Sequence, residues 1–153
     1  MPTPIMSAQH KTVMLKWWDL PGTDVVQVLW PRYYRAASAV VLVLDSQELG
    51  HLQPGTEDGT DVLLDGTDKT NVKELVRGML DNVDLGRKPI VVFAAKSEMD
   101  GTVKTEAIKQ AMNWDYVVKG HEDRVAIIEG SAKTGEGCEA LLDFLEEKLR
   151  LQP

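Results

Sequence analysis

Two short stretches of this chain carry residues that could do chemistry beside predicted strands. Asp19 and Gly22 lie in the stretch WDLPG at residues 18–22, and SAK occupies residues 131–133. A carboxylate at the end of a strand suits a hard cation such as magnesium, and a glycine lets the backbone approach a ligand closely. The alternative for Asp19 and Gly22 is an ordinary turn at the end of a strand, and the alternative for residues 131–133 is a loop that caps the final helix.

The elements that would position these residues alternate along the chain. Continuous, β-branched apolar runs at 39–44, 89–94 and 124–128 predict strands buried on both faces, and a further strand is expected at 12–18. One-sided apolar stripes predict helices at 71–83, 104–114 and 139–151, the last with Glu146 and Arg150 as a helical ion pair. We therefore expect an α/β fold with three layers, a mostly parallel sheet with helices on both faces, and ligands at the carboxyl ends of its strands.

Composition narrows the class of protein. A length of 153 residues fits a single domain, and a net charge of -7 disfavours nucleic acid as a partner. No apolar run reaches the roughly 18 residues of a membrane span, and we expect no direct membrane anchor in this chain. The single cysteine, Cys138, excludes an internal disulfide and fits a reducing compartment such as the cytoplasm, as a free thiol buried on a helix.

Residues 47–70 interrupt this alternation. They are rich in Gly, Asp and Thr and repeat the pattern DGTD at 58–61 and 65–68. Carboxylates around glycines can bind calcium, but the spacing is not that of an EF-hand. We expect an acidic surface insertion.

Five segments, in order, resemble the ADP-ribosylation factor family of small GTPases. They are residues 16–35, 39–46, 71–82, 89–101 and 129–149, so the resemblance omits the first ten residues and 47–70. It implies a small-GTPase fold in which Asp19 holds magnesium through water and the Gly22 backbone senses the terminal phosphate. The nucleotide-binding residues that it implies, if binding is retained, are Asp19, Gly22, Lys96, Glu98, Ser131, Ala132 and Lys133.

The sequence departs from the family's pattern at several functional positions. It contains no phosphate-binding loop of the form G-x-x-x-x-G-K-[ST], and the first strand of the family's sheet has no counterpart. Thr23 stands where the family has the Gln that orients the attacking water, so we expect no catalytic residue. Ala95 replaces the Asn of the base-reading motif, and Glu98 replaces its Asp, which predicts weak guanine selectivity.

These departures favour a degenerate GTPase, without nucleotide or metal cofactor, that acts as a protein-interaction module. The resemblance implies vesicle traffic and a site peripheral to endomembranes. One alternative is a genuine GTPase that binds GTP, GDP and Mg²⁺ and whose P-loop segment is absent from this chain. Another is a receiver-like phosphoacceptor with Asp19 or Asp45 at a strand end, although no acidic pair accompanies them.

The resemblance also predicts partners. Trp18 and Tyr33 match a hydrophobic cluster that the family presents to effectors on its switch-II face, with Trp30 close by, and core packing is the alternative for all three. Without the family's first strand, the strands at 12–18 and 39–44 should pair directly, or a second copy should fill the gap. Pro2 and Thr3 faintly resemble a switch-I motif that touches magnesium.

Overall fold

The computed structural model describes residues 6–47, 61–63 and 69–151. Three parallel strands form the main sheet, β3 (Val40–Asp45), β6 (Ile90–Ala95) and β7 (Val125–Glu129), in the order β3-β6-β7. The register aligns Val40 with Ile90 and Ile90 with Val125. Their apolar, β-branched sequences fit strands that are covered on both faces, so the predicted parallel sheet is confirmed.

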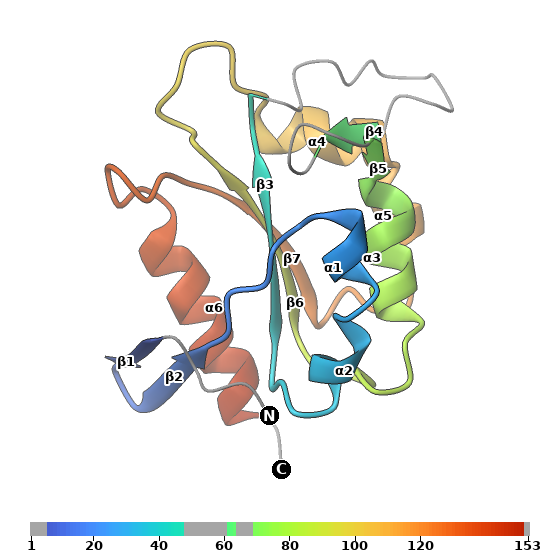
Figure 1. The fold of residues 1–153 in the computed structure, drawn as a ribbon. Coiled ribbons are helices and arrows are strands. Elements are labelled where there is room, and N and C mark those ends of the chain that lie inside the picture. The colour runs from blue at the N-terminus through green and yellow to red at the C-terminus, as the bar shows by residue number, and fades with distance from the viewer. Residues whose placement is uncertain (1–5, 48–60, 64–68, 152–153) are drawn as a thin grey trace.

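Helices cover both faces of this sheet. Figure 1 shows α6 (Cys138–Arg150) on one side, and α3 (Val72–Leu80) and α5 (Trp114–Val117) on the other. Helix α4 (Thr105–Met112) precedes α5, and Asn113 between them has a left-handed φ of 50° that ends α4. The three predicted helical segments are thus confirmed, although α3 ends at Leu80, before the predicted Val83, which is exposed.

The buried core lies between the sheet and α3, α4 and α5. Val76 and Met79 of α3 and Ile108 and Met112 of α4 pack against Leu44 of β3 and its neighbours. Arg124 is buried, and its guanidinium donates to the carbonyls of Lys88 at 2.8 Å and Leu80 at 3.0 Å. It therefore joins the end of α3 to the start of β6, with its polar atoms satisfied.

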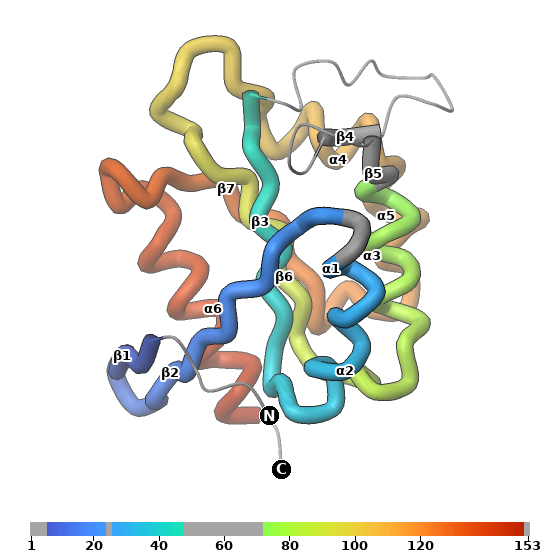
Figure 2. The backbone as a smooth tube through the Cα atoms, viewed as in Figure 1, coloured from blue at the N-terminus to red at the C-terminus, as the bar shows by residue number. Residues whose placement is uncertain are grey.

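A β-hairpin stands apart from the main sheet. Strands β1 (Met6–His10) and β2 (Val13–Trp17) pair with each other in antiparallel register, with His10 opposite Val13. Alternation places Val13, Leu15 and Trp17 on one face, which is the more buried, and Met14 and Lys16 on the exposed face. The hairpin lies beside α6 in Figures 1 and 2.

The expectation that strands 12–18 and 39–44 pair directly is wrong. Strand β2 pairs with β1, and in the described part of the chain β3 pairs with β6 alone. The amides of Val40 and Ser46 donate to Pro89 and Ala95. In a parallel ladder the alternate residues, Val41 and Val43, therefore direct their N–H and C=O groups to the opposite edge of β3.

Between β3 and α3 the structure describes a short antiparallel pair, β4 (Asp61–Leu63) with β5 (Lys69–Asn71). The predicted acidic insertion and its calcium alternative fall mostly on residues 48–60 and 64–68, outside the described residues, as do Pro2 and Thr3. Two short helices, α1 (Asp24–Gln27) and α2 (Pro31–Tyr34), follow the hairpin. No helix in the described ranges is long and apolar enough to cross a membrane.

Candidate functional site

The loops that follow β3, β6 and β7 meet at the carboxyl edge of the sheet. Parallel pairing places Asp45 opposite Ala95, and Ala94 opposite Glu129, so the segments after each strand emerge side by side. The amide of Ser97 donates to the carbonyl of Gly130 at 3.1 Å, which joins the second and third loops. The sequence-predicted residues Lys96, Glu98 and Ser131 are thereby brought to one edge.

Lys96 is held by an acidic residue of the neighbouring strand. Its Nζ atom lies 2.5 Å from Oδ2 of Asp45. The Lys96 backbone has a left-handed φ of 63°, unusual for a residue with a side chain. Beside it, the Ser46 hydroxyl donates to the Ala95 carbonyl at 2.5 Å. Sequence reasoning did not assign Asp45 to this site, although its place directly after an apolar run was a usable signal.

Ser131 organises the third loop from a fully buried position. Its Oγ accepts hydrogen bonds from the amides of Lys133 at 3.2 Å and Thr134 at 3.1 Å. The Ser131 side chain also hydrogen-bonds the Glu98 carboxylate, and this bond, with smaller contributions from the positive charges of Lys133 and Lys96, lowers the pKa of Glu98. Glu98, which is exposed, is therefore ionised at neutral pH.

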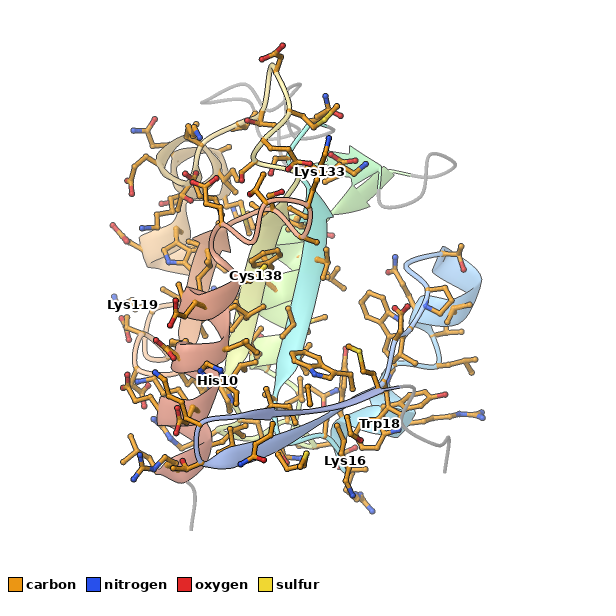
Figure 3. The ribbon with its side chains drawn as sticks, turned by 90° about the vertical axis from the view of Figure 1, so that its left-hand side faces the viewer. His10, Lys16, Trp18, Lys119, Lys133 and Cys138 are labelled. Carbon is orange, nitrogen blue, oxygen red and sulfur yellow. The ribbon has the colours of Figure 1, made fainter. Side chains whose placement is uncertain are left out.

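Glu136 is a second bridge that sequence reasoning missed. Its carboxylate accepts a hydrogen bond from the Ser97 hydroxyl at 3.1 Å, and its carbonyl accepts from the amide of Ser131 at 2.8 Å. Glu136 thus ties the loops after β6 and β7 together. Ala132 and Lys133 are exposed at the tip of the loop, and Figure 3 shows Lys133 at this end of the molecule.

The turn after β2 is fixed by residues that follow it. The Gln27 amide donates to the Gly22 carbonyl at 2.7 Å, and the Trp30 indole donates to the Pro21 carbonyl at 3.2 Å. Thr23 precedes α1 with an extended backbone, and its side chain makes no capping hydrogen bond. Asp19 is exposed. These hydrogen bonds join the turn to α1 and to the start of α2. Neither of them joins the turn to the loops after β6 and β7.

The aromatic residues divide between core and surface. Trp30 and Tyr34 are each 8% exposed and belong to the hydrophobic core, whereas Trp18 and Tyr33 are half-buried. Because its indole is enclosed, Trp30 follows the core-packing alternative rather than that of a surface anchor. The exposed apolar residues at this position are its neighbours, Val28 at 73% and Leu29 at 37%.

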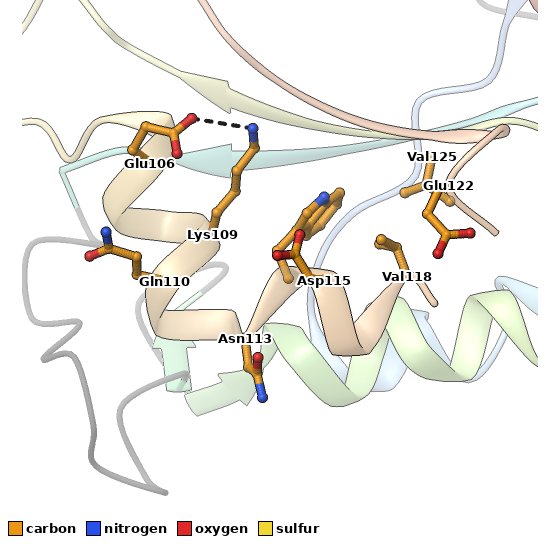
Figure 4. Close-up of a pocket in the computed structure, with 9 residues that line it drawn as sticks. Glu106, Lys109, Gln110, Asn113, Asp115, Val118, Glu122 and Val125 are labelled. Atoms are coloured by element: carbon orange, nitrogen blue, oxygen red, sulfur yellow. Dashed lines mark hydrogen bonds and ion pairs between the residues drawn. The ribbon is translucent and has the colours of Figure 1, made fainter. Parts of the chain in front are cut away.

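A separate groove runs along α4 and α5. Glu106, Lys109 and Gln110 of α4 and Asp115 and Val118 line it, as the close-up in Figure 4 shows. Its lining includes none of the residues that the sequence assigned to a site. The candidate site is therefore the carboxyl edge of the sheet.

Comparisons with known proteins agree with this arrangement. A sequence model described as "ADP-ribosylation factor family" matches residues 2–78. ADP-ribosylation factor-like protein 5 of Dictyostelium discoideum is 26% identical over 136 residues, which are 89% of this chain and 63% of that relative. ADP-ribosylation factor-like protein 1 of Saccharomyces cerevisiae is 25% identical over 146 residues, 95% of this chain and 69% of the relative. The chain thus spans less than two thirds of the first relative's length.

A solved structure gives the same fold. The Arl6 BBS3 small GTPase from Trypanosoma brucei, determined with the bound nucleotide analogue GppNp, superposes with a TM-score of 0.73 at 21% identity. The match covers 97% of this chain and 79% of that one.

The match to the family's sequence model also includes residues 2–10 and 47–70, which lie outside the five resembling segments. These findings leave no support for the receiver-like alternative.

Proposed function

Because this chain belongs to the ADP-ribosylation factor family, we propose that it is a degenerate member that binds GTP or GDP weakly or not at all. In this proposal it acts as a protein-interaction module in vesicle traffic, in the cytoplasm and at the periphery of endomembranes. The altered positions Thr23, Ala95 and Glu98 support the loss of nucleotide chemistry, since they affect water orientation and base reading separately.

The observation that carries the proposal is the internal pairing of the base-reading side chains. The Lys96 ammonium contacts Asp45 at 2.5 Å, and hydrogen bonding with Ser131 lowers the pKa of the exposed Glu98 carboxylate. Glu98 is also one methylene longer than the family's Asp, and a bidentate contact with guanine depends on that distance. Lys96 thus has an acidic partner in the chain itself, without a base.

The proposed partner surface is the segment that carries α1 and α2. Val28 and Leu29 are exposed there beside the buried Trp30. Half-buried Trp18 and Tyr33 lie on neighbouring parts of the same segment. Apolar side chains exposed together beside aromatic ones are typical anchors for a protein partner.

A titration with a fluorescent GDP or GTP analogue in the presence of magnesium tests the proposal. The matched variant carries Ala95→Asn and Glu98→Asp, which restore the family's base-reading residues. Micromolar or tighter binding by the unmodified chain would contradict the proposal.

Among the described strands β3 pairs with β6 alone, and its other edge favours a second candidate function, a genuine GTPase completed by a strand and P-loop from outside these residues. Val41 and Val43 direct their backbone groups to this edge, and Val43 is 60% exposed. A second copy of the chain is one source of a strand at this edge, but not of the P-loop, which its sequence also lacks. Val43→Pro removes a donor at this edge only, so it should dissociate an assembly made there, whereas Val43→Thr should not. Analytical ultracentrifugation distinguishes these results.

A further inference from the structure

A cluster of potential metal ligands lies away from the nucleotide-site loops, where the hairpin meets α6. His10 ends β1, and Asp143 and Glu146 are three residues apart on α6, so both carboxylates lie on one face of the helix. The Nε2 atom of His10 is 2.7 Å from Oδ1 of Asp143. One ligand atom from each of the three residues lies within 4.8 Å of the other two. Figure 3 shows His10 on the hairpin beside the helix.

Each carboxylate makes its contacts through a single oxygen. Asp143 contacts His10 and Lys11 through Oδ1. Glu146 contacts Thr12 and Arg150 through Oε1. Within the described part of the chain these contacts leave Oδ2 of Asp143 and Oε2 of Glu146 available to a cation. Glu146 is only 6% exposed, so a cation bound there would be partly withdrawn from water, where its attraction to a carboxylate is stronger.

We propose that His10, Asp143 and Glu146 bind a divalent transition metal ion of the zinc class. An imidazole with two carboxylates suits Zn²⁺ and Co²⁺, whereas Mg²⁺ and Ca²⁺ prefer oxygen ligands alone. Ligand atoms on one tetrahedral zinc ion lie about 3.4 Å apart. Small rotamer shifts from the observed separations bring the three atoms to that spacing. The ion would tie the hairpin to α6, so this site is independent of nucleotide binding.

Lys11 competes with the metal for the same carboxylate. Its Nζ lies 2.6 Å from Oδ1 of Asp143. The Lys11 side chain is 53% exposed, so it can move into water when the metal binds. Substitution of Lys11 should therefore strengthen metal binding. If the three residues only hydrogen-bond to one another and form no metal site, no such effect is expected.

The test is titration of the full chain with ZnSO₄ by calorimetry and with CoCl₂ by visible absorption. A Cys138→Ser background removes the single thiol of the chain, which could otherwise bind zinc. We expect one equivalent of Zn²⁺ to bind and Co²⁺ to give the intense visible bands of a tetrahedral site. His10→Gln and Asp143→Asn should each weaken binding on the order of tenfold or more, and Lys11→Met should tighten it several-fold. MgCl₂ should give no heat.

The control variant is His121→Gln, because His121 lies outside the cluster and contacts Arg124. It should bind zinc as the background does. Absence of zinc binding at millimolar concentration overturns the proposal, and so does equal binding by His10→Gln. Unchanged binding by Lys11→Met also overturns it, and this exposed substitution keeps the experiment decisive even if His10→Gln fails to fold.

Discussion

Lys96 Nζ lies 2.5 Å from Asp45 Oδ2, and this ion pair joins the carboxyl ends of two adjacent parallel strands. Asp45 ends β3, and Lys96 is the first residue after β6. In this chain the Lys96 ammonium pairs with an acidic side chain of the neighbouring strand.

This pair should contribute little to the free energy of unfolding. The Lys96 side chain is 54% exposed and that of Asp45 is 26% exposed, so solvent screens their attraction. A double-mutant cycle with Asp45→Ala and Lys96→Ala, measured by urea denaturation, should give a coupling below about 1 kcal/mol. A much larger value would mean that the pair is a structural requirement of the sheet edge.

Gly137→Ala should destabilise the protein by about 3 kcal/mol, through crowding and a left-handed backbone. Gly137 has a φ of 72°, and a Cβ atom there would lie 2.1 Å from the Glu129 carbonyl oxygen. Glu129 is the last residue of β7 and lies two residues before Ser131.

The matched control for this prediction is Gly135→Ala. Gly135 has a φ of 84°, but a Cβ atom there meets nothing within 4 Å. Gly135→Ala therefore measures the free-energy cost of the left-handed backbone alone, about 1 kcal/mol. Equal losses for the two variants in denaturation experiments would disprove the crowding at Gly137.

Trp30 and Val28 should respond differently to substitution. Trp30→Ala removes a buried indole and its hydrogen bond to Pro21, and should cost about 3–5 kcal/mol of stability. Val28→Ala removes an exposed side chain and should change stability by less than about 0.5 kcal/mol. Thermal denaturation checks both, and a stable Trp30→Ala variant would show that this aromatic lies outside the core.

The contact between the hairpin and α6 should weaken in acid. A hydrogen bond from Lys11 lowers the pKa of Asp143, and one from Thr12 lowers the pKa of Glu146. Since both pKa values are depressed on folding, the carboxylates stabilise the protein above their unfolded pKa values, about 3.9 and 4.3. That stabilisation is lost as the pH falls through the lower folded values.

Melting temperatures between pH 7 and pH 3 measure this loss. An Asp143→Asn, Glu146→Gln variant should lose less stability than the unmodified chain over that interval, because it lacks both titrations. Parallel curves for the two proteins would show that other carboxylates dominate the acid response.

Much of the fold followed from local sequence patterns, because continuous apolar runs and one-sided stripes set strands β3, β6 and β7 and the main helices. The β1–β2 hairpin was missed because its turn, Lys11 and Thr12, has no glycine or asparagine, although Lys11 adopts a left-handed φ of 46°. The pairing partner of β2 was also wrong, since strand order depends on contacts between segments distant in sequence.

The candidate site, too, was predicted from the sequence only in part. Lys96, Glu98 and Ser131 were identified by their motifs, and their proximity follows from parallel strands ending at one edge. The Asp45–Lys96 pair and the Glu136 bridge were not predicted, because they depend on the register of the strands and on the path of the loop after β7. The Trp18 and Tyr33 assignments remain predictions.

The most direct test of the central claim is the equilibrium affinity of this chain for a fluorescent GDP analogue with magnesium. With Lys96 paired to Asp45, and with Thr23, Ala95 and Glu98 in place of the family's Gln, Asn and Asp, we expect a Kd above about 100 μM, which corresponds to less than about 5.5 kcal/mol of binding free energy. A Kd of about 1 μM or tighter, abolished by unlabelled GDP and weakened by Lys96→Ala, would contradict the account and establish a working nucleotide site.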